Sequence, residues 1–224
     1  MQSGSHLQVL IPIFLVSIAC LIPPLNRIRP GLSQTIALMA VTISLIASAT
    51  LFTRILNTPA GYLDYFIGHS WNSDTFLSTG QPIGIVQRGD IFGGIMLMLV
   101  NGIGFLVTIY SGQYIPHEID KNRIVYYYTV LLLMLAGMSG VTMTGDCFNF
   151  YIFLEIATIS SYVLVAIPGD GRSYEAAFKY TLIGALGSIL LVFGIALLFS
   201  ATGTLNMAYA ASQIDKIMTA PKGS

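Results

Sequence analysis

The sequence predicts an all-α membrane protein, built as a bundle of about six transmembrane helices. Hydrophobic residues make up 54% of the 224 positions, charged residues only 9%, and the mean hydropathy is +0.76. Such a composition is typical of membrane proteins rather than of soluble domains. Six apolar runs, each long enough to cross a lipid bilayer as a helix, are separated mostly by short polar connectors.

The predicted helices and their connectors fill the chain as a single transmembrane domain, residues 1–224. The helix ranges are 7–25, 35–52, 91–110, 124–143, 148–167 and 176–200, with a long outer loop at 57–89. These segments leave no room for a separate soluble domain of ordinary size. No Lys or Arg precedes the first range, so we interpret it as a retained helix rather than as a cleaved signal peptide.

The long loop and the C-terminal segment carry weaker signals. Residues Gln81–Gln87 alternate weakly between polar and apolar side chains, which favours a short strand or one arm of a hairpin. Asp90 precedes the third apolar range, and we expect it to cap that helix. After the sixth range the chain passes into a weak helix, Tyr209–Met218, and does not look like a finished C-terminus. We therefore expect a truncated or split protein.

Basic residues are slightly more frequent on one side of the predicted bundle. One side carries Arg27, Arg29, Lys121, Arg123, Arg172 and Lys179, and the other carries Arg54, Arg88, Lys216 and Lys222. The positive-inside rule then predicts an outside N-terminus, with the loops after the first, third and fifth helices in the cytoplasm. The expected location is the inner cell membrane, with several passes through the bilayer.

Composition and spacing also argue against several kinds of function. The formal net charge is zero, so no general attraction to nucleic acid is implied. Cys20 and Cys147 are far apart and lack a CxxC neighbour, which predicts packing thiols rather than a disulfide or metal framework. Metal-ligand spacings, phosphate-binding loops and nucleophile elbows are absent from the sequence. We expect no metal, no cofactor and no catalysis by this chain alone.

Glu155 is the one formal charge inside the apolar range 148–167. It follows Asp146 by nine residues, so at about 1.5 Å per residue it lies roughly 13 Å from the helix mouth, near mid-membrane. A carboxylate there costs at least ~2.5 kcal/mol on insertion scales, and it normally marks an ion or proton route. Burial raises a carboxyl pKa and a nearby cation lowers it, so a group balanced between the two can take up and release a proton. Glu155 is the predicted proton site, and the alternative is a structural side chain bonded across helices.

Lys179 is the natural partner to consider, but helix geometry separates it from Glu155. Glu155 is about 12 residues, roughly 18 Å, from the cytoplasmic end of its helix, whereas Lys179 is about one turn into the next helix. Even with the lysine stem extended, a gap on the order of 8–10 Å remains. We therefore expect water or another side chain to connect them, with Lys179 as an electrostatic modulator of proton transfer. The alternative is a snorkelling anchor that pairs locally with Glu175.

Two polar residues at the start of the fifth range are candidate supporting groups. Asp146 follows a glycine and precedes an aromatic helix start, so we expect an N-cap at the positive end of the helix dipole. A role in ion entry is the alternative. Asn149 is expected to hydrogen-bond within the bundle, for packing or as part of a relay.

Three further residues lie towards the cytoplasm. Ser160 and Ser161 are one to two turns from Glu155, and they either line a wetted path or bond the helix backbone at i−4. His117, in a predicted cytoplasmic loop, is either a proton-entry group or a solvated loop histidine.

Several motifs carry a resemblance to a known family. They are Thr144-Gly145-Asp146-x-Phe148-Asn149-x-Tyr151-x-Phe153-x-Glu155, Ser160-Ser161-Tyr162, Ala176-Ala177-x-Lys179-Tyr180, Gly187-Ser188 and Thr202-Gly203-Thr204-Leu205-Asn206-Met207-Ala208. Together they resemble the proton-pumping antiporter-like family. That family includes the D-type subunits of Mrp-type Na+/H+ antiporters, the corresponding subunits of membrane-bound hydrogenases, and the N, M and L-type subunits of respiratory complex I.

The resemblance implies roles for two residues and a larger fold. Glu155 matches the glutamate that the family uses in proton transfer, and Lys179 matches a lysine at the start of helix six. The family fold has about fourteen helices in two inverted repeats. The family's helix-seven lysine and second repeat are not among these residues, so the resemblance implies that another polypeptide or a missing half supplies them.

Two hypotheses of function follow. In the first, the chain is the N-terminal portion of an antiporter-like subunit that moves H+, alone or coupled to Na+, within a larger complex of integral membrane proteins in the lipid bilayer. In the second, it is a structural subunit that conducts nothing. A membrane-embedded enzyme is poorly supported, because redox or quinone chemistry would have to lie in partner subunits.

Overall fold

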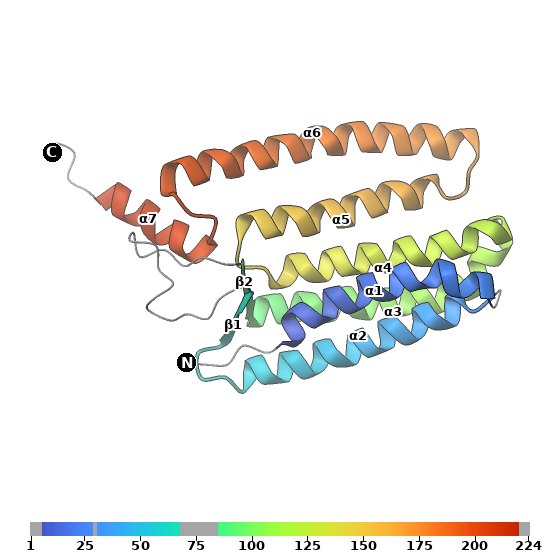
Figure 1. Cartoon of the computed structure of the whole chain (residues 1–224), viewed down its shortest axis with the longest axis horizontal. Helices are drawn as coiled ribbons and strands as arrows, with labels where there is room; N and C mark the ends of the chain where they lie inside the picture. The colour runs from blue at the N-terminus through green and yellow to red at the C-terminus, as the bar shows by residue number, and fades with distance from the viewer. Residues whose placement is uncertain (1–5, 29–30, 68–84, 220–224) are drawn as a thin grey trace.

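The computed structural model describes residues 6–28, 31–67 and 85–219, and helices dominate it (Figure 1). The six long helices are α1 Leu7–Ile28, α2 Ser33–Leu56, α3 Ile91–Glu118, α4 Lys121–Met143, α5 Cys147–Ala166 and α6 Gly171–Thr202. A shorter helix, α7, follows at Met207–Thr219. All six long helices have the length and composition needed to cross a membrane. The predicted fold class, an all-α membrane bundle of about six transmembrane helices, is confirmed.

Polar residues set the helix ends beyond the limits of the apolar runs. α6 begins at Gly171 rather than at residue 176, because the Asp170 carboxylate caps it by accepting a hydrogen bond from the Ser173 backbone N–H at 3.1 Å. Hydrogen bonds from the hydroxyl and the backbone of Ser173 hold the pKa of Asp170 below its ordinary value. α3 continues to Glu118, so the prediction that His117 lies in a loop is wrong. Hydrophobicity marks only the apolar part of a helix, and hydrogen bonding carries the helix further into polar sequence.

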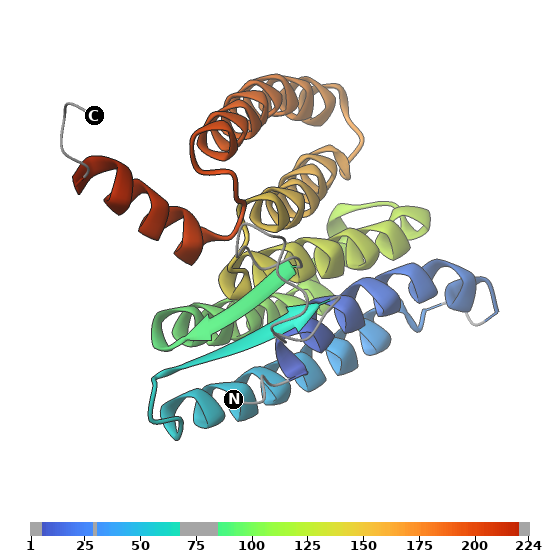
Figure 2. The ribbon, with the colours of Figure 1, turned by 60° about the vertical axis from the view of Figure 1, so that its left-hand side comes forward.

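A two-stranded antiparallel hairpin lies at one end of the helices (Figures 1 and 2). β1, Tyr62–Ile67, pairs with β2, Ile85–Asp90, and an Arg88–Asp64 ion pair of 2.6 Å joins the two strands. β1 was not predicted, because its sequence Tyr-Leu-Asp-Tyr-Phe-Ile lacks regular alternation. We call this end of the bundle, where α2, α4 and α6 finish and α3 and α5 begin, the hairpin end.

The predicted strand at 81–87 is only partly within the described residues. Residues 85–87 form the first half of β2, and residues 81–84 lie outside the described part of the chain. The predicted cap of the third helix is confirmed, because the Asp90 carboxylate accepts a hydrogen bond from the Gly93 N–H at 2.6 Å.

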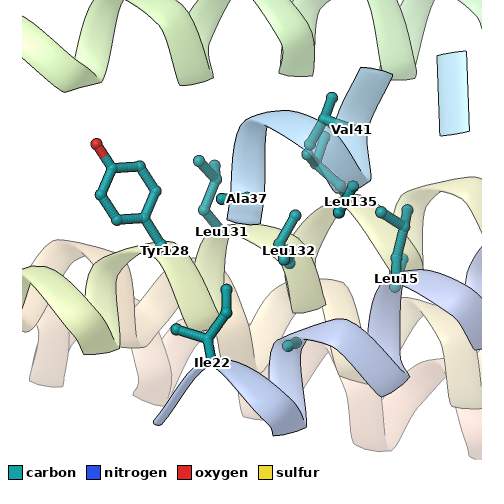
Figure 3. Close-up of a cluster of buried hydrophobic side chains, with 11 residues drawn as sticks. Leu15, Ile22, Ala37, Val41, Tyr128, Leu131, Leu132 and Leu135 are labelled. Atoms are coloured by element: carbon teal, nitrogen blue, oxygen red, sulfur yellow. The ribbon is translucent and has the colours of Figure 1, made fainter. Parts of the chain in front are cut away.

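The apolar core lies among α1, α2 and α4 (Figure 3). Its fully or almost fully buried members are Leu15, Ala19, Ile22, Ala37, Ala40, Val41, Tyr128, Leu131, Leu132, Leu135 and Ala136. A buried polar cluster adds α3 to the same bundle: the Asn101 amide accepts from Ser44 of α2 at 2.6 Å and donates to Ser139 of α4 at 3.3 Å. Small and polar residues of this kind let transmembrane helices approach closely and hydrogen-bond to one another.

α5 and α6 extend this bundle sideways. Figure 2 shows α5 beside α4, with α6 beyond it, and most residues of α6 are exposed. At the hairpin end, the segment after α6 bonds to the segment before α5. The Cys147 N–H donates to the Leu205 carbonyl at 2.8 Å, and the Met207 N–H donates to the Gly145 carbonyl at 3.0 Å. The motif residues around Leu205 thus tie the end of α6 to the start of the helix that carries Glu155.

Candidate functional site

Glycines of α4 determine how closely α5 packs. A Cβ on Gly137 would lie 2.7 Å from the Phe153 carbonyl oxygen and 2.6 Å from the Ala157 nitrogen, both on α5. A Cβ on Gly140 would overlap the ring of Phe153. The α5 backbone therefore lies directly against α4. Successive residues are about 100° apart around a helix, so Glu155 points roughly away from Phe153, Ala157 and α4.

Glu155 lies in a groove between α5 and α6. The groove has a volume of about 510 Å³, and Glu155 is half-buried in it. Its lining residues are Tyr151, Glu155, Ile159, Tyr162 and Val163 from α5, and Thr181, Ala185, Ser188 and Ile189 from α6. Among the residues that the structure describes, the Glu155 carboxylate has no hydrogen-bonded or ionic partner. Hydroxyl groups are thus the polar neighbours that the groove offers it.

Contacts on either side of Glu155 define the register of the two antiparallel helices. Towards the hairpin end, the Ser188 hydroxyl donates to the Tyr151 hydroxyl at 3.4 Å. Towards the opposite end, the Ser161 and Tyr180 hydroxyl groups are hydrogen-bonded to each other at 3.3 Å. Glu155 lies four residues after Tyr151 and six before Ser161. Counting back from Ser188 and forward from Tyr180 places it level with the α6 turn that contains Ala185.

Lys179 is not brought to Glu155. Its ammonium pairs with the Glu175 carboxylate at 2.5 Å, and the two side chains are 68% and 65% exposed. Because α6 starts early, Lys179 is more than two turns into the helix rather than one, contrary to the prediction. It is still six residues from Ala185, or about 9 Å along the axis. The structure therefore has the local pairing that the sequence left as the alternative, and exposed pairs of this kind contribute little to stability.

The start of α5 shows the expected capping geometry. The Asp146 carboxylate accepts hydrogen bonds from the Phe148 and Asn149 N–H groups at 3.0 and 2.9 Å. The Asn149 side-chain amide donates to the Thr144 hydroxyl at 2.9 Å. The N-cap prediction for Asp146 is confirmed, and Asn149 is buried in the same local network.

The other predicted supporting residues do not line the groove. Ser160 is buried, and its hydroxyl donates to the Ile156 carbonyl at 2.6 Å, which is the i−4 backbone bond left open by the sequence. Ser161 bonds the Thr158 carbonyl at 2.7 Å in addition to Tyr180. His117 is exposed in the last turn of α3, where Nδ1 lies 2.9 Å from the Gln113 carbonyl oxygen.

Tyr162, Thr181 and Ser188 line the groove without having been predicted from the sequence. One signal was present: Tyr151, Glu155 and Tyr162 recur at i, i+4 and i+11, which places them on one face of a helix. The α6 residues could not be assigned, because their position opposite Glu155 depends on the register of two helices. Within the described residues, no three His, Cys, Asp or Glu side chains are grouped so that they could hold a metal ion.

Fold and groove together define a multi-pass membrane protein with a carboxylate between two of its helices. Residues 144–222, which include α5 and α6, match the family model described as NADH:quinone oxidoreductase/Mrp antiporter, transmembrane. The chain belongs to this antiporter-like family, as the motifs predicted.

Three individual proteins to which the chain is similar support the same family assignment. The D-type subunit of the Na(+)/H(+) antiporter of Alkalihalophilus pseudofirmus is 35% identical over 149 residues, 65% of this chain and 30% of the relative. The N-type subunit of the NADH-quinone oxidoreductase of Desulforudis audaxviator is 30% identical over 217 residues, 97% of this chain and 41% of the relative. A chain of the membrane-bound sulfane sulfur reductase, an archaeal respiratory membrane complex, superposes with a TM-score of 0.83 at 28% identity, covering 95% of this chain and 41% of the other. This chain thus spans well under half the length of each of these proteins.

Proposed function

We propose that this chain carries a proton site within a larger membrane complex, and that Glu155 is the group that gains and releases the proton. The observation that carries the proposal is the position of Glu155, near the middle of α5, in a groove lined by hydroxyl groups. A carboxylate at mid-membrane depth is costly, and it commonly serves ion or proton movement. The relatives, an antiporter subunit and a quinone oxidoreductase subunit, support the same class of function.

The cation moved is H+, alone or in exchange for Na+, and other integral membrane subunits complete the pathway in the lipid bilayer. Lys179 does not contact Glu155, because about 9 Å of helix separates their levels. It acts on Glu155 only through its positive charge, much of which the Glu175 carboxylate neutralises. In the proposed orientation, in the inner cell membrane, the hairpin end and the N-terminus lie outside. The basic residues Arg27, Lys121, Arg123 and Arg172, at the opposite end, then face the cytoplasm.

The test is proton flux into membrane vesicles that contain the assembled complex. Glu155→Gln keeps the side-chain shape and removes the titratable group, and we expect flux to fall at least about 100-fold, the lower range for loss of a proton-transfer group. Glu118→Gln is the matched control, because it removes an exposed carboxylate at the end of α3, away from the groove. Wild-type flux in Glu155→Gln, with equal amounts of assembled complex, would contradict the proposal.

A second candidate, a non-conducting structural subunit, is favoured by one observation. No cation contacts Glu155 within the described residues, and Lys179 is engaged with Glu175. In that case, Glu155→Gln leaves flux unchanged, while deletion of the chain prevents assembly of the complex. The two functions are thus separated by one pair of variants.

A further inference from the structure

Tyr162 brings a hydroxyl group to the same part of the groove as Glu155. The two residues are seven positions apart on α5, or about 10 Å along the axis, and both line the groove. Side chains of a helix lean towards its N-terminus, so the Tyr162 ring extends along the groove in the direction of Glu155. A Cβ on Gly184 of α6 would overlap the Tyr162 hydroxyl, which shows that this hydroxyl ends against Gly184.

Gly184 adjoins Ala185, the residue of α6 that is level with Glu155. The Tyr162 hydroxyl therefore ends at the turn of α6 that is level with the Glu155 backbone, although the Cα atoms of Tyr162 and Glu155 are about 10 Å apart along the axis. Thr181 of the same helix also lines the groove there. A groove of about 510 Å³ that is lined by several hydroxyl groups has the room and the polar partners that bound water requires.

Further hydroxyl groups continue from Tyr162 towards the end opposite the hairpin. The rings of Tyr162 and Tyr180 meet edge to face, with centroids 4.7 Å apart. The Tyr180 hydroxyl in turn is hydrogen-bonded to the Ser161 hydroxyl at 3.3 Å. Tyr162 thus lies between Glu155 and the Ser161–Tyr180 pair, on the side of the groove away from the hairpin.

We propose that Tyr162 is a proton relay between Glu155 and the end of the groove opposite the hairpin. This proposal rests on the proposed role of Glu155. A water on the Ser161–Tyr180 side that carries an extra proton from the aqueous phase gives it to the Tyr162 oxygen and is left as neutral water, while the original O–H proton leaves through a groove water to the Glu155 carboxylate. One O–H bond forms and one breaks at Tyr162, which stays neutral, and Glu155 becomes the neutral acid. Release of the proton back to the end opposite the hairpin reverses these steps.

Gly184 leaves open the space that the Tyr162 hydroxyl occupies. It lacks the side chain that would occupy the place of the Tyr162 hydroxyl. Gly187, one turn further along α6, has no neighbouring atom within 4 Å of a built Cβ. Alanine at Gly184 therefore displaces the hydroxyl, whereas alanine at Gly187 does not.

The test combines proton flux with the protonation of Glu155 in the assembled complex. Tyr162→Phe keeps the ring and its contact with Tyr180 but removes the hydroxyl. We expect flux to fall about 10-fold to 100-fold, at or below the lower limit of the usual range for a proton-transfer group. Because a relay changes the rate and not the equilibrium, the pH at which Glu155 is half-protonated stays at its wild-type value in infrared titration. The ratio of flux in H2O to flux in D2O rises, since proton transfer now limits the rate.

Gly184→Ala should lower flux in the same way, and Gly187→Ala should leave it unchanged. Wild-type flux in Tyr162→Phe, together with loss of flux in Glu155→Gln, overturns the relay while the proposed function stands. Wild-type flux in Glu155→Gln removes both. If Tyr162→Phe fails to accumulate, the two glycine variants decide: equal flux in Gly184→Ala and Gly187→Ala contradicts the relay.

Discussion

Gly137 of α4 lies against the turn of α5 that spans Phe153 to Ala157. A Cβ at Gly137 would be 2.6 Å from the Ala157 nitrogen, closer than packed carbon atoms approach. Glu155 is in the middle of this turn, on the side that faces away from α4. The missing side chain of Gly137 therefore fixes both how close α5 comes to the bundle and which way Glu155 points.

Gly137→Ala should destabilise the protein and reduce flux. The new methyl group forces the two backbones apart, and overpacking of this kind typically costs about 1–3 kcal/mol. Gly102→Ala is the control, because a Cβ there meets nothing within 4 Å and alanine is favoured over glycine in a helix by about 1 kcal/mol. Thermal unfolding of the purified complex measures both variants. Equal stability of Gly137→Ala and Gly102→Ala would show that the close approach does not matter.

Much of this fold follows from the sequence because lipid imposes a simple pattern. Long apolar runs predict the six helices, and Asp90 and Asp146 stand immediately before two of them, where their carboxylates cap the first N–H groups. β1 was missed because its side chains lack alternation. The early start of α6 was missed because the cap at Asp170 lies in polar sequence, outside the apolar run.

The candidate site was less accessible from the sequence. Glu155 stands out as a charge within an apolar run, and this needs no structure. The hydroxyl groups around it come from two helices, and their meeting depends on packing that no local pattern encodes. Tyr162 reaches Gly184 only because α5 and α6 run antiparallel in one particular register.

Two variants of Asp146 distinguish a helix-capping role from a role in ion entry. Asp146→Ala removes the acceptor for two backbone N–H groups, and we expect a loss of stability of about 1 kcal/mol. Asn caps helices about as well as Asp, so Asp146→Asn should keep both stability and flux. Thermal unfolding and vesicle flux are compared for the two variants. Normal stability with strongly reduced flux in Asp146→Asn would instead assign the carboxylate to ion entry.

The Lys179–Glu175 pair should tune the pH dependence of flux by charge alone. Lys179→Gln removes a positive charge near the groove, and the pH at half-maximal flux should then rise. Removing the anion with Glu175→Gln leaves Lys179 unneutralised and should move this pH down. The two levels are about 9 Å apart along the helix axis, and at an effective dielectric constant near 20 a full charge at that distance gives a shift of at most about 1.4 pH units.

A double variant completes this test. Lys179→Gln combined with Glu175→Gln removes both charges and should return the pH profile close to that of the wild type. The profile is recorded as proton flux across a series of pH values at fixed salt, because salt screens exposed charges. Identical profiles for the two single variants would mean that the pair has no influence on the groove.

The most direct test of the central proposal is to observe the Glu155 carboxyl group itself while protons move. Difference infrared spectroscopy of the assembled complex, after a rapid pH step, detects the carbonyl band that a carboxyl group shows only when protonated. We predict a band that appears and disappears at the rate of proton flux in the wild type and is absent from Glu155→Gln, but present in Glu118→Gln. The same transient band in Glu155→Gln, or a Glu155 band that never changes during flux, would contradict the account.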